Sequence, residues 1–173
     1  MIRRAAKNDI AQIVDIYHKI LELEKNGKAH TGWKKNIYPT ERTARDAFIK
    51  NELYVLEEDG RILAAARINQ EQVPEYTYCH WTYDAPDSEV MVIHTLVVDP
   101  DFSGSGIGSK FVSFYEELAL KCGCHYLRMD TNADNAAARA LYKKLGYSEI
   151  DVIPCIFNGI AGVQLVCLEK KLG

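Results

Sequence analysis

The segment VMVIHTLVVDPDFSGSGIGSK (residues 90–110) joins a nearly all-apolar run to a loop with glycine at three alternate positions. An apolar run of this length is typical of a central strand that is covered on both faces. Apolar residues recur at helical spacing from Gly108 to about Lys121, which predicts a helix directly after the loop. Such a junction leaves backbone N–H groups without partners at the positive end of the helix dipole. The segment therefore predicts a binding site for an anion such as a phosphate.

The spacing of these glycines excludes the two commonest nucleotide-binding loops. Gly104, Gly106 and Gly108 form G-x-G-x-G, whereas the dinucleotide-binding pattern is G-x-G-x-x-G. The Walker A pattern requires a glycine directly before the lysine, but Ser109 precedes Lys110 here. If the loop binds another phosphate ligand, Lys110 is expected to add positive charge at its rim. From the loop alone, a structural interpretation stays open, in which the glycines only allow close packing.

The composition is that of an ordinary globular protein, and it limits the classes of partner. The chain has 173 residues, of which 47% are hydrophobic and 26% are charged, so one domain over residues 1–173 is expected. The formal net charge of −3 offers no basic surface for nucleic acid. No apolar stretch is long enough to span a membrane, and the N-terminus lacks the apolar core of a signal peptide. We therefore expect a cytoplasmic protein without nucleic-acid or membrane partners.

The cysteines suggest neither a disulfide framework nor a metal site. There are five of them, an odd number, and reduced thiols are typical of cytosolic proteins. The sequence CGCH, from Cys122 to His125, lacks a second pair of residues at zinc-ligand spacing. Gly123 is more typical of a residue that ends a helix. We therefore expect no bound metal.

Hydrophobic periodicity and turn signals predict seven strands and four helices in the order β-α-α-β-β-β-α-β-α-β-β. Asp59-Gly60 tolerates the positive φ of a tight turn, which predicts an antiparallel hairpin around it. Strand–helix–strand units favour parallel neighbours, so the sheet is expected to be mixed. The expected helices span residues 9–25, 40–50, 108–121 and 135–146, and the expected strands span 1–5, 52–58, 61–68, 89–98, 125–132, 147–153 and 163–172.

Two segments of the sequence resemble the signatures of the GNAT superfamily of N-acetyltransferases. TLVVDPDFSGSGIGSKFVSFYEELA (residues 95–119) is similar to the acetyl-CoA-binding motif, in which a strand ends in Val-x-Pro and a glycine-rich loop opens a helix. NAAARALYKKLGY (residues 135–147) is similar to the second signature, Asn-x-x-Ala-x-x-Leu-Tyr-x-x-x-Gly-Phe. Its positions are occupied by Asn135, Ala138, Leu141, Tyr142, Gly146 and Tyr147. The two signatures stand in the family's order and at its separation.

The resemblance implies an α/β, single-domain GNAT-like fold with a central, mixed, splayed sheet of about seven strands flanked by about four helices. It also implies acetyl-CoA as the acetyl donor, with the pantetheine arm in the gap of the splayed sheet. The residues implied in binding acetyl-CoA are Leu96, Val97, Val98, Ser103, Gly104, Ser105, Gly106, Ile107, Gly108, Ser109, Asn135, Ala138 and Tyr142. One departure concerns Ser103, because the family usually has Arg or Gln there, so one contact to the cofactor is missing.

Acetyl transfer to an amine needs a base for the amine and an acid for the leaving thiolate. The resemblance places Tyr142 at the position of the acid. For the base, the candidates are His94 on the central strand and Asp130 at the end of the strand over residues 125–132. Glu89 is a third candidate, and a water chain to one of these groups stays open. Each of them also has a purely structural interpretation, as a core histidine or as a solvated strand-end carboxylate.

The acceptor site is expected between the early helices. The segment HTGWKKNIYPT (residues 30–40) carries Trp33 and Tyr38, which are candidates for substrate binding in a lid over the amine. The aromatic region from Tyr76 to Tyr83 is a second candidate wall. We predict direct acetyl transfer to a primary amine of a small molecule or peptide. The alternative is a non-catalytic acyl-CoA-binding or sensor module. The last strand is expected to be free for pairing, so a homodimer is considered beside a monomer.

Overall fold

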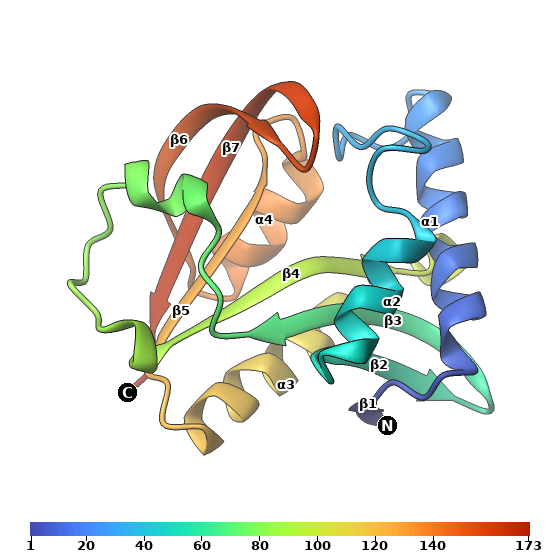
Figure 1. The fold of residues 1–173 in the computed structure, drawn as a ribbon, viewed down its shortest axis with the longest axis horizontal. Helices are drawn as coiled ribbons and strands as arrows, with labels where there is room; N and C mark the ends of the chain where they lie inside the picture. The colour runs from blue at the N-terminus through green and yellow to red at the C-terminus, as the bar shows by residue number, and fades with distance from the viewer.

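Strand β4 (Val90–Val98) lies at the centre of a seven-stranded sheet in the computed structural model, which describes residues 1–173. The strands follow the order β1-β2-β3-β4-β5-β7-β6 (Figure 1). The other strands are β1 (Ile2–Arg4), β2 (Leu53–Glu58), β3 (Arg61–Asn69), β5 (Tyr126–Asn132), β6 (Ser148–Phe157) and β7 (Ile160–Lys171). The helices are α1 (Asp9–Lys25), α2 (Glu41–Ile49), α3 (Ile107–Lys121) and α4 (Ala136–Lys144). The order and number of the elements confirm the predicted α/β fold.

The sheet divides into two arms because β4 and β5 pair over only three residues. Their parallel pairing runs from Val90 to Val92 on β4 and then stops. Beyond that point β4 stays paired with β3, whereas β5 stays paired with β7. A bulge accompanies the separation, since Thr95 and Leu96 of β4 lie opposite the single residue Ala66 of β3. The sheet is therefore splayed at its centre, as the family resemblance implies.

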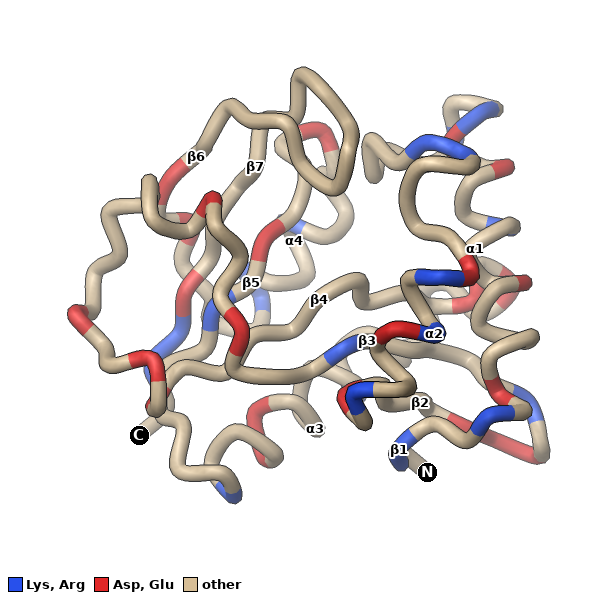
Figure 2. The backbone as a smooth tube through the Cα atoms, in the orientation of Figure 1, with Lys and Arg blue, Asp and Glu red and all other residues tan.

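Helices cover both faces of the arm that contains β1 to β4 (Figure 1). Alternate residues of β2 show the two layers, because side chains of a strand point to opposite faces. Leu53 and Val55 pack into a core with α1 and α2, whereas Tyr54 and Leu56 pack into a core with α3 and α4. The middle strand β4 carries no Lys, Arg, Asp or Glu, as Figure 2 shows, because both of its faces are covered.

Two predictions at the C-terminal end are wrong. The last strand, β7, was expected to be free for pairing, but it lies between β5 and β6, so the sheet edges are β1 and β6. The last two strands are also longer than expected and reach the turn at Asn158-Gly159. Pro154 follows the expected end of this strand at residue 153, and a proline without an N–H is tolerated in β6 because that strand is an edge.

The irregular segment between β3 and β4, residues 70–89, is tied to the sheet by a buried ion pair. Arg128 of β5 and Glu169 of β7 are 5% and 2% exposed, and Nε of Arg128 lies 3.1 Å from Oε2 of Glu169. Arg128 also donates a hydrogen bond of 2.8 Å to the carbonyl of Tyr83. The Thr82 backbone N–H in turn donates to Glu169 at 3.0 Å. The pair therefore holds this segment against the arm that contains β5 and β7.

We expect the replacement Arg128→Met to destabilise the protein by about 3 kcal/mol, because it leaves the Glu169 carboxylate buried without its counter-charge. The measurement is the free energy of unfolding in urea. Arg139→Met is the matched control, since Arg139 pairs with Glu149 at the surface, where water compensates each charge. Equal losses in the two variants would contradict a structural role for the buried pair.

Candidate active site

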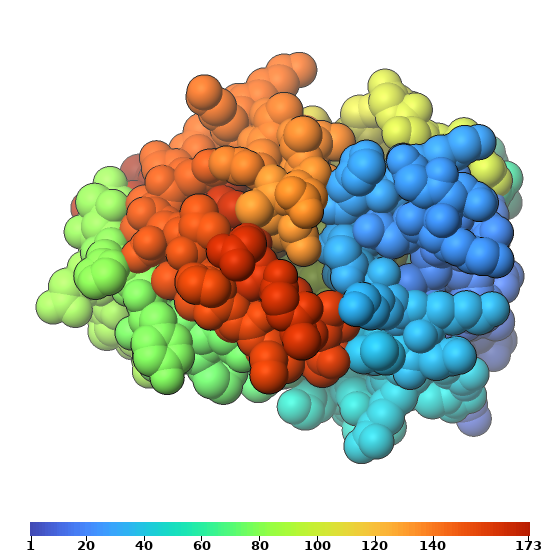
Figure 3. Space-filling view, turned by 90° about the horizontal axis from the view of Figure 1, so that it is seen from above, coloured from blue at the N-terminus to red at the C-terminus, as the bar shows by residue number.

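A cavity of about 640 Å³ opens where β4 and β5 separate. This volume is in the range of sites for small molecules and cofactors. In Figure 3 the surface is hollowed between the blue N-terminal segment and the orange and red segments that contain α4 and the β6–β7 hairpin. The structure brings ten of the predicted site residues together in the wall of this cavity. They are Trp33, Tyr38, His94, Leu96, Val97, Val98, Asp130, Asn135, Ala138 and Tyr142.

The β4 arm supplies an unpaired backbone edge to this cavity. From Ile93 onward β4 has no partner on the side of β5, and Leu96, Val97 and Val98 line the cavity. Backbone N–H and C=O groups on such an edge bind an extended chain with amide groups as a neighbouring strand would. Across the gap, Asn135 accepts a hydrogen bond from the Ala138 N–H at 3.2 Å and so caps α4. Its side-chain amide N–H groups have no partner within the protein.

The glycine loop continues from β4 just outside the cavity. The backbone N–H groups of Gly104, Gly106, Ile107, Gly108 and Ser109 have no acceptor within the protein. Gly104 and Gly106 have φ values of 79° and 81°, and nothing lies within 4 Å of a Cβ at either position. A side chain would be strained there, and the open space lets an anion approach the N–H groups. The loop is thus built as an anion site at the start of α3.

Two residues of the loop have other roles than the sequence suggested. A Cβ at Gly108 would lie 3.2 Å from Leu141 Cδ2, so this glycine allows α3 to pack closely on α4. Of the three alternate glycines, Gly108 is therefore the one that serves close packing. Lys110 does not point its charge at the loop, because its Nζ lies 3.0 Å from a Glu58 carboxylate oxygen. The backbone N–H groups therefore supply the positive potential of the loop.

A buried carboxylate fixes where the loop begins. Asp99, directly after β4, is 3% exposed and accepts hydrogen bonds from Lys19 Nζ at 2.8 Å and from Arg61 Nη2 at 2.9 Å. It also accepts from the Asp101 N–H at 3.1 Å. These contacts connect the end of β4 to α1 and β3. The glycine loop therefore starts from a braced position, although its own tip is exposed.

Tyr142 reaches the cavity from α4. Its ring is buried, its hydroxyl has no hydrogen-bond partner within the protein, and the oxygen is not sealed from solvent. Burial and then the negative charge of Asp130 raise the pKa of Tyr142 well above its ordinary value. The hydroxyl therefore keeps its proton at neutral pH. A protonated tyrosine hydroxyl that is free in a cavity is able to donate its proton to a ligand bound there.

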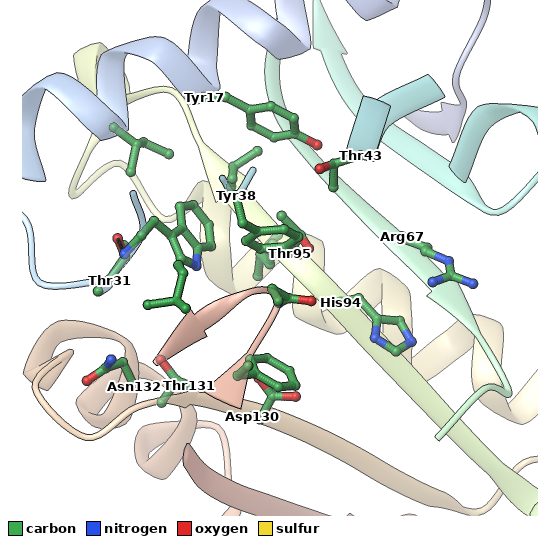
Figure 4. A pocket seen from close by; sticks show the side chains of 18 of the residues that line it. Tyr17, Thr31, Tyr38, Thr43, Arg67, His94, Thr95, Asp130, Thr131 and Asn132 are labelled. Atoms are coloured by element: carbon green, nitrogen blue, oxygen red, sulfur yellow. Dashed lines mark hydrogen bonds between the residues drawn. The ribbon is translucent and has the colours of Figure 1, made fainter. Parts of the chain in front are cut away.

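Asp130 stands two residues beyond the last pair between β4 and β5, and it lines the cavity (Figure 4). Burial raises the pKa of its carboxyl to about 6, an effect that a hydrogen bond from Tyr76 partly offsets. The Tyr76 hydroxyl donates to Oδ2 at 2.7 Å, whereas Oδ1 accepts no hydrogen bond from the protein. Asp130 therefore combines a pKa near neutrality with one free oxygen, which is what a general base needs.

His94 lies on the opposite arm, also two residues beyond the last pair. Its Nε2 lies 2.8 Å from Asn69 Oδ1, and because an amide oxygen only accepts, Nε2 carries the proton of the bond. Burial, and then the positive charge of Arg67, lower the pKa of His94 to about 4. The imidazole is therefore neutral at neutral pH and a weak acceptor of a proton. The third candidate base, Glu89, precedes β4 and does not line the cavity.

The lid segment predicted over residues 30–40 forms the wall opposite Asp130. Trp33 and Tyr38 pack edge to face with their ring centres 5.9 Å apart, and both line the cavity. Glu24 of α1 holds the segment by accepting from the Thr31 N–H at 2.8 Å and from the Gly32 N–H at 3.0 Å. The second predicted wall is different, because Trp81 and Tyr83 line a separate, shallower depression of about 380 Å³.

Sequence patterns missed two residues of the site. Thr95 in the bulge has a φ of 51°, which a β-branched side chain rarely adopts, and its hydroxyl is hydrogen-bonded to that of Tyr38 (Figure 4). Tyr76 was expected only as part of an aromatic wall, but it lies behind Asp130 and is hydrogen-bonded to it. An unusual φ and a contact between distant segments leave no local signal in a sequence.

The fold and the site together define an enzyme class that binds an elongated anionic cofactor beside a splayed sheet. Residues 14–147 match the model of the acetyltransferase (GNAT) family. The chain therefore belongs to this family of acetyl-CoA-dependent N-acetyltransferases. The family, the fold and the enzyme class that the sequence predicted are confirmed.

Two relatives are N-acetyltransferases. An uncharacterized N-acetyltransferase of Methanocaldococcus jannaschii is 30% identical over 153 residues, which are 88% of this chain and 62% of the relative. The chain thus spans less than two thirds of that relative's length. The thialysine N-epsilon-acetyltransferase of Bos taurus is 26% identical over 151 residues, which are 87% of this chain and 85% of the relative.

Two solved structures show the likeness of the fold. A GNAT-family acetyltransferase from Streptococcus agalactiae aligns with a TM-score of 0.84 and 23% identity, over 100% of this chain and 95% of that chain. An acetyltransferase from Salmonella typhimurium, solved with its cofactor acetyl-CoA, aligns with a TM-score of 0.71 and 21% identity, over 100% of this chain and 94% of that chain.

None of the helices of the present protein has the length and apolar character needed to cross a membrane.

We expect Asp130→Asn to stabilise the protein at neutral pH. The pKa of the carboxyl is about 6 in the folded protein against an ordinary 3.8, so the folded state loses stability as the pH rises through this interval. Above it the full cost, on the order of 1–3 kcal/mol, is present, and asparagine does not carry it. The free energy of unfolding of the variant should therefore exceed that of the wild type at pH 7 and approach it at pH 4. An equal difference at both pH values would show that the carboxyl is not destabilising.

Proposed function

We propose that the protein transfers an acetyl group from acetyl-CoA to a primary amine of a small molecule or peptide by direct attack. The observation that carries the proposal is the continuity of one surface. Unpaired N–H groups of the glycine loop are followed by the free edge of β4 and then by a cavity with Asp130 and Tyr142 in its wall. Membership of the acetyltransferase (GNAT) family supports acetyl-CoA as the donor.

The donor site in this proposal uses three parts of the chain. The unpaired N–H groups of the loop, those of Gly104 and of residues 106–109, hold the pyrophosphate, since they and the helix dipole favour negative charge. The free edge of β4 from Leu96 to Val98 pairs with the amides of the pantetheine arm. Asn135 adds the free N–H groups of its amide, and the small side chain of Ala138 lets the arm approach α4. In this proposal the acetyl thioester lies at the Asp130 end of the cavity.

The chemistry follows from the protonation states of two side chains. Oδ1 of Asp130 takes one proton from the ammonium group of the acceptor, which leaves a neutral amine. The amine nitrogen forms a bond to the thioester carbonyl carbon, and a backbone N–H near Val97 stabilises the charge on the carbonyl oxygen. When the carbon–sulfur bond breaks, Tyr142 donates its proton to the leaving sulfur. The extra proton on the acetylated nitrogen passes through solvent to the tyrosinate, which returns the tyrosine to its neutral form, and Asp130 releases its own proton to solvent.

Asp130 is preferred over His94 as the base. At neutral pH a group with a pKa of about 6 is mostly ionised yet still basic, whereas the pKa of about 4 makes the imidazole a poor acceptor. His94 is also engaged by Asn69, whereas Oδ1 of Asp130 is free. We therefore assign His94 to the wall of the cavity.

The acceptor enters between the lid segment and the β6–β7 hairpin in this proposal. Trp33 and Tyr38 face this part of the cavity, and Phe157 and Ile160 of the hairpin complete an apolar wall. Such a wall suits the aliphatic stem of an amine, while its charged end meets Asp130, a partly buried carboxylate of the cavity wall. The thialysine N-epsilon-acetyltransferase relative supports a small amine with an extended side chain as the first class to assay.

Ser109→Asp tests the glycine loop without weakening the helix. Ser109 is the third residue of α3, where an acid suits the helix dipole but places negative charge beside the unpaired N–H groups. The affinity for acetyl-CoA, measured by calorimetry, should fall by about tenfold or more, while stability in urea is retained. Ser113→Asp, on the exposed face one turn further along α3, is the control and should keep the affinity. Equal affinities of the two variants would remove the loop from the cofactor site.

The catalytic proposal is tested by release of free CoA with polyamines, amino acids including thialysine, aminoglycosides and peptides as acceptors. At least one class should release CoA in proportion to acetylated product. Tyr142→Phe should then lower kcat by about 10²-fold, with little change in acetyl-CoA affinity. A protein that binds acetyl-CoA but acetylates no amine would be the non-catalytic acyl-CoA-binding module instead. Unchanged turnover of the variant would remove Tyr142 as the acid.

A further inference from the structure

Tyr76 is a buried tyrosine outside the cavity wall that touches the proposed base. It lies in the short 3-10 helix Pro74–Tyr78, between β3 and β4, and is 2% exposed. Its hydroxyl donates to Oδ2 of Asp130 at 2.7 Å. No other hydrogen bond from the protein reaches the Asp130 carboxylate. The orientation of this carboxylate therefore depends on a single side chain from a separate segment.

Tyr76 is itself held in place by its neighbours. The indole N–H of Trp81 donates to the Tyr76 carbonyl at 3.0 Å, and the two rings pack edge to face with their centres 5.1 Å apart. Burial raises the pKa of Tyr76 well above its ordinary value, so its hydroxyl remains a donor at every pH of interest. The packing thus presents a rigid, permanently protonated donor to Asp130. Such support from a second layer is what fixes catalytic groups in geometry.

We propose that Tyr76 is a positioning residue of the acetyl transfer, which holds the Asp130 carboxylate by Oδ2 so that Oδ1 is presented to the incoming amine. This inference rests on the proposed function, in which Asp130 is the base. The hydrogen bond also favours the ionised carboxylate, because a carboxylate accepts from a hydroxyl more strongly than a neutral carboxyl does. Tyr76 therefore counteracts the effect of burial on Asp130 and keeps the base ionised at neutral pH.

Other ionisable groups surround Asp130, and they set the background for its titration. From the 3-10 helix, Glu75 opposes ionisation by its negative charge. Tyrosines from the lid segment and from α4, and thiols from β6 and β7, interact with the carboxylate from the remaining sides. These groups are Tyr38, Tyr142, Cys155 and Cys167. Across the cavity stand His94 and Arg67. Among them all, only Tyr76 donates a hydrogen bond to Asp130, so its hydroxyl is the group to remove.

The experiment compares Tyr76→Phe with the wild type and with Tyr78→Phe. Tyr78 belongs to the same 3-10 helix but is 71% exposed, so it is a matched control for the loss of one phenolic hydroxyl. The first readout is the pH profile of kcat/KM for CoA release, with acetyl-CoA and the most active amine of the panel. The second is the titration of the Asp130 carboxyl carbon by NMR, assigned by its absence in Asp130→Asn. The second readout needs no acceptor.

Without the Tyr76 hydroxyl, the acidic limb of the profile should move up by about one pH unit. Such a shift lowers kcat/KM about fivefold at pH 6 and leaves it close to the wild type at pH 8. The NMR midpoint of Asp130 should rise by the same amount in Tyr76→Phe and stay unchanged in Tyr78→Phe. An equal loss of activity at all pH values, or an unchanged midpoint, would overturn the inference and leave Tyr76 as a packing residue.

The two readouts separate this inference from the proposed function. If the wild type released no CoA from any amine, the proposed function would fail, and the titration would still decide whether Tyr76 controls the ionisation of Asp130. If the wild type were active and the Asp130 midpoint did not respond to Tyr76→Phe, the inference alone would fail.

Discussion

The structure depends on the point where the pairing of β4 and β5 ends. Three residue pairs join the two strands, and beyond Val92 and Arg128 each strand is held only by its other neighbour. A bulge at Thr95 and Leu96 accompanies the separation, and two core clusters pack helices onto the opposite faces of the β4 arm. The gap leaves a strand edge unpaired in the interior of the sheet, where an extended chain with amide groups is able to pair with it.

The gap between β4 and β5 also explains why the site lowers the stability of the folded protein. The gap opens a cavity beside a carboxylate whose pKa burial raises to about 6, and Thr95 takes a backbone conformation that its side chain disfavours. The glycine loop adds N–H groups that have no partner in the chain. These features cost free energy in the protein alone, and such a cost is typical of functional sites. Elsewhere, as at Arg128 and Glu169, buried charges are paired.

Local patterns were sufficient to predict the elements of the fold and the glycine loop that opens α3. The apolar spacing after Asn8 predicts a helix over 9–25 and the structure has Asp9–Lys25, because helix formation is governed by near neighbours. The glycine loop is similarly local. The outer ends of β6 and β7 were missed because Pro154 is acceptable only on an edge strand, and edges are decided by the whole sheet. The bond between Tyr76 and Asp130 joins residues 54 positions apart, so no spacing rule contains it.

We propose that the glycine loop and the gap of the sheet form one binding surface for acetyl-CoA. The most direct measurement is a titration of the isotope-labelled protein with acetyl-CoA, followed through the NMR shifts of the backbone N–H groups. We predict that the largest shifts occur together in Gly104–Ser109 and in the bulged half of β4, from Ile93 to Val98. Shifts confined to the depression around Trp81 and Tyr83, or shifts in the loop without any in β4, would contradict the account.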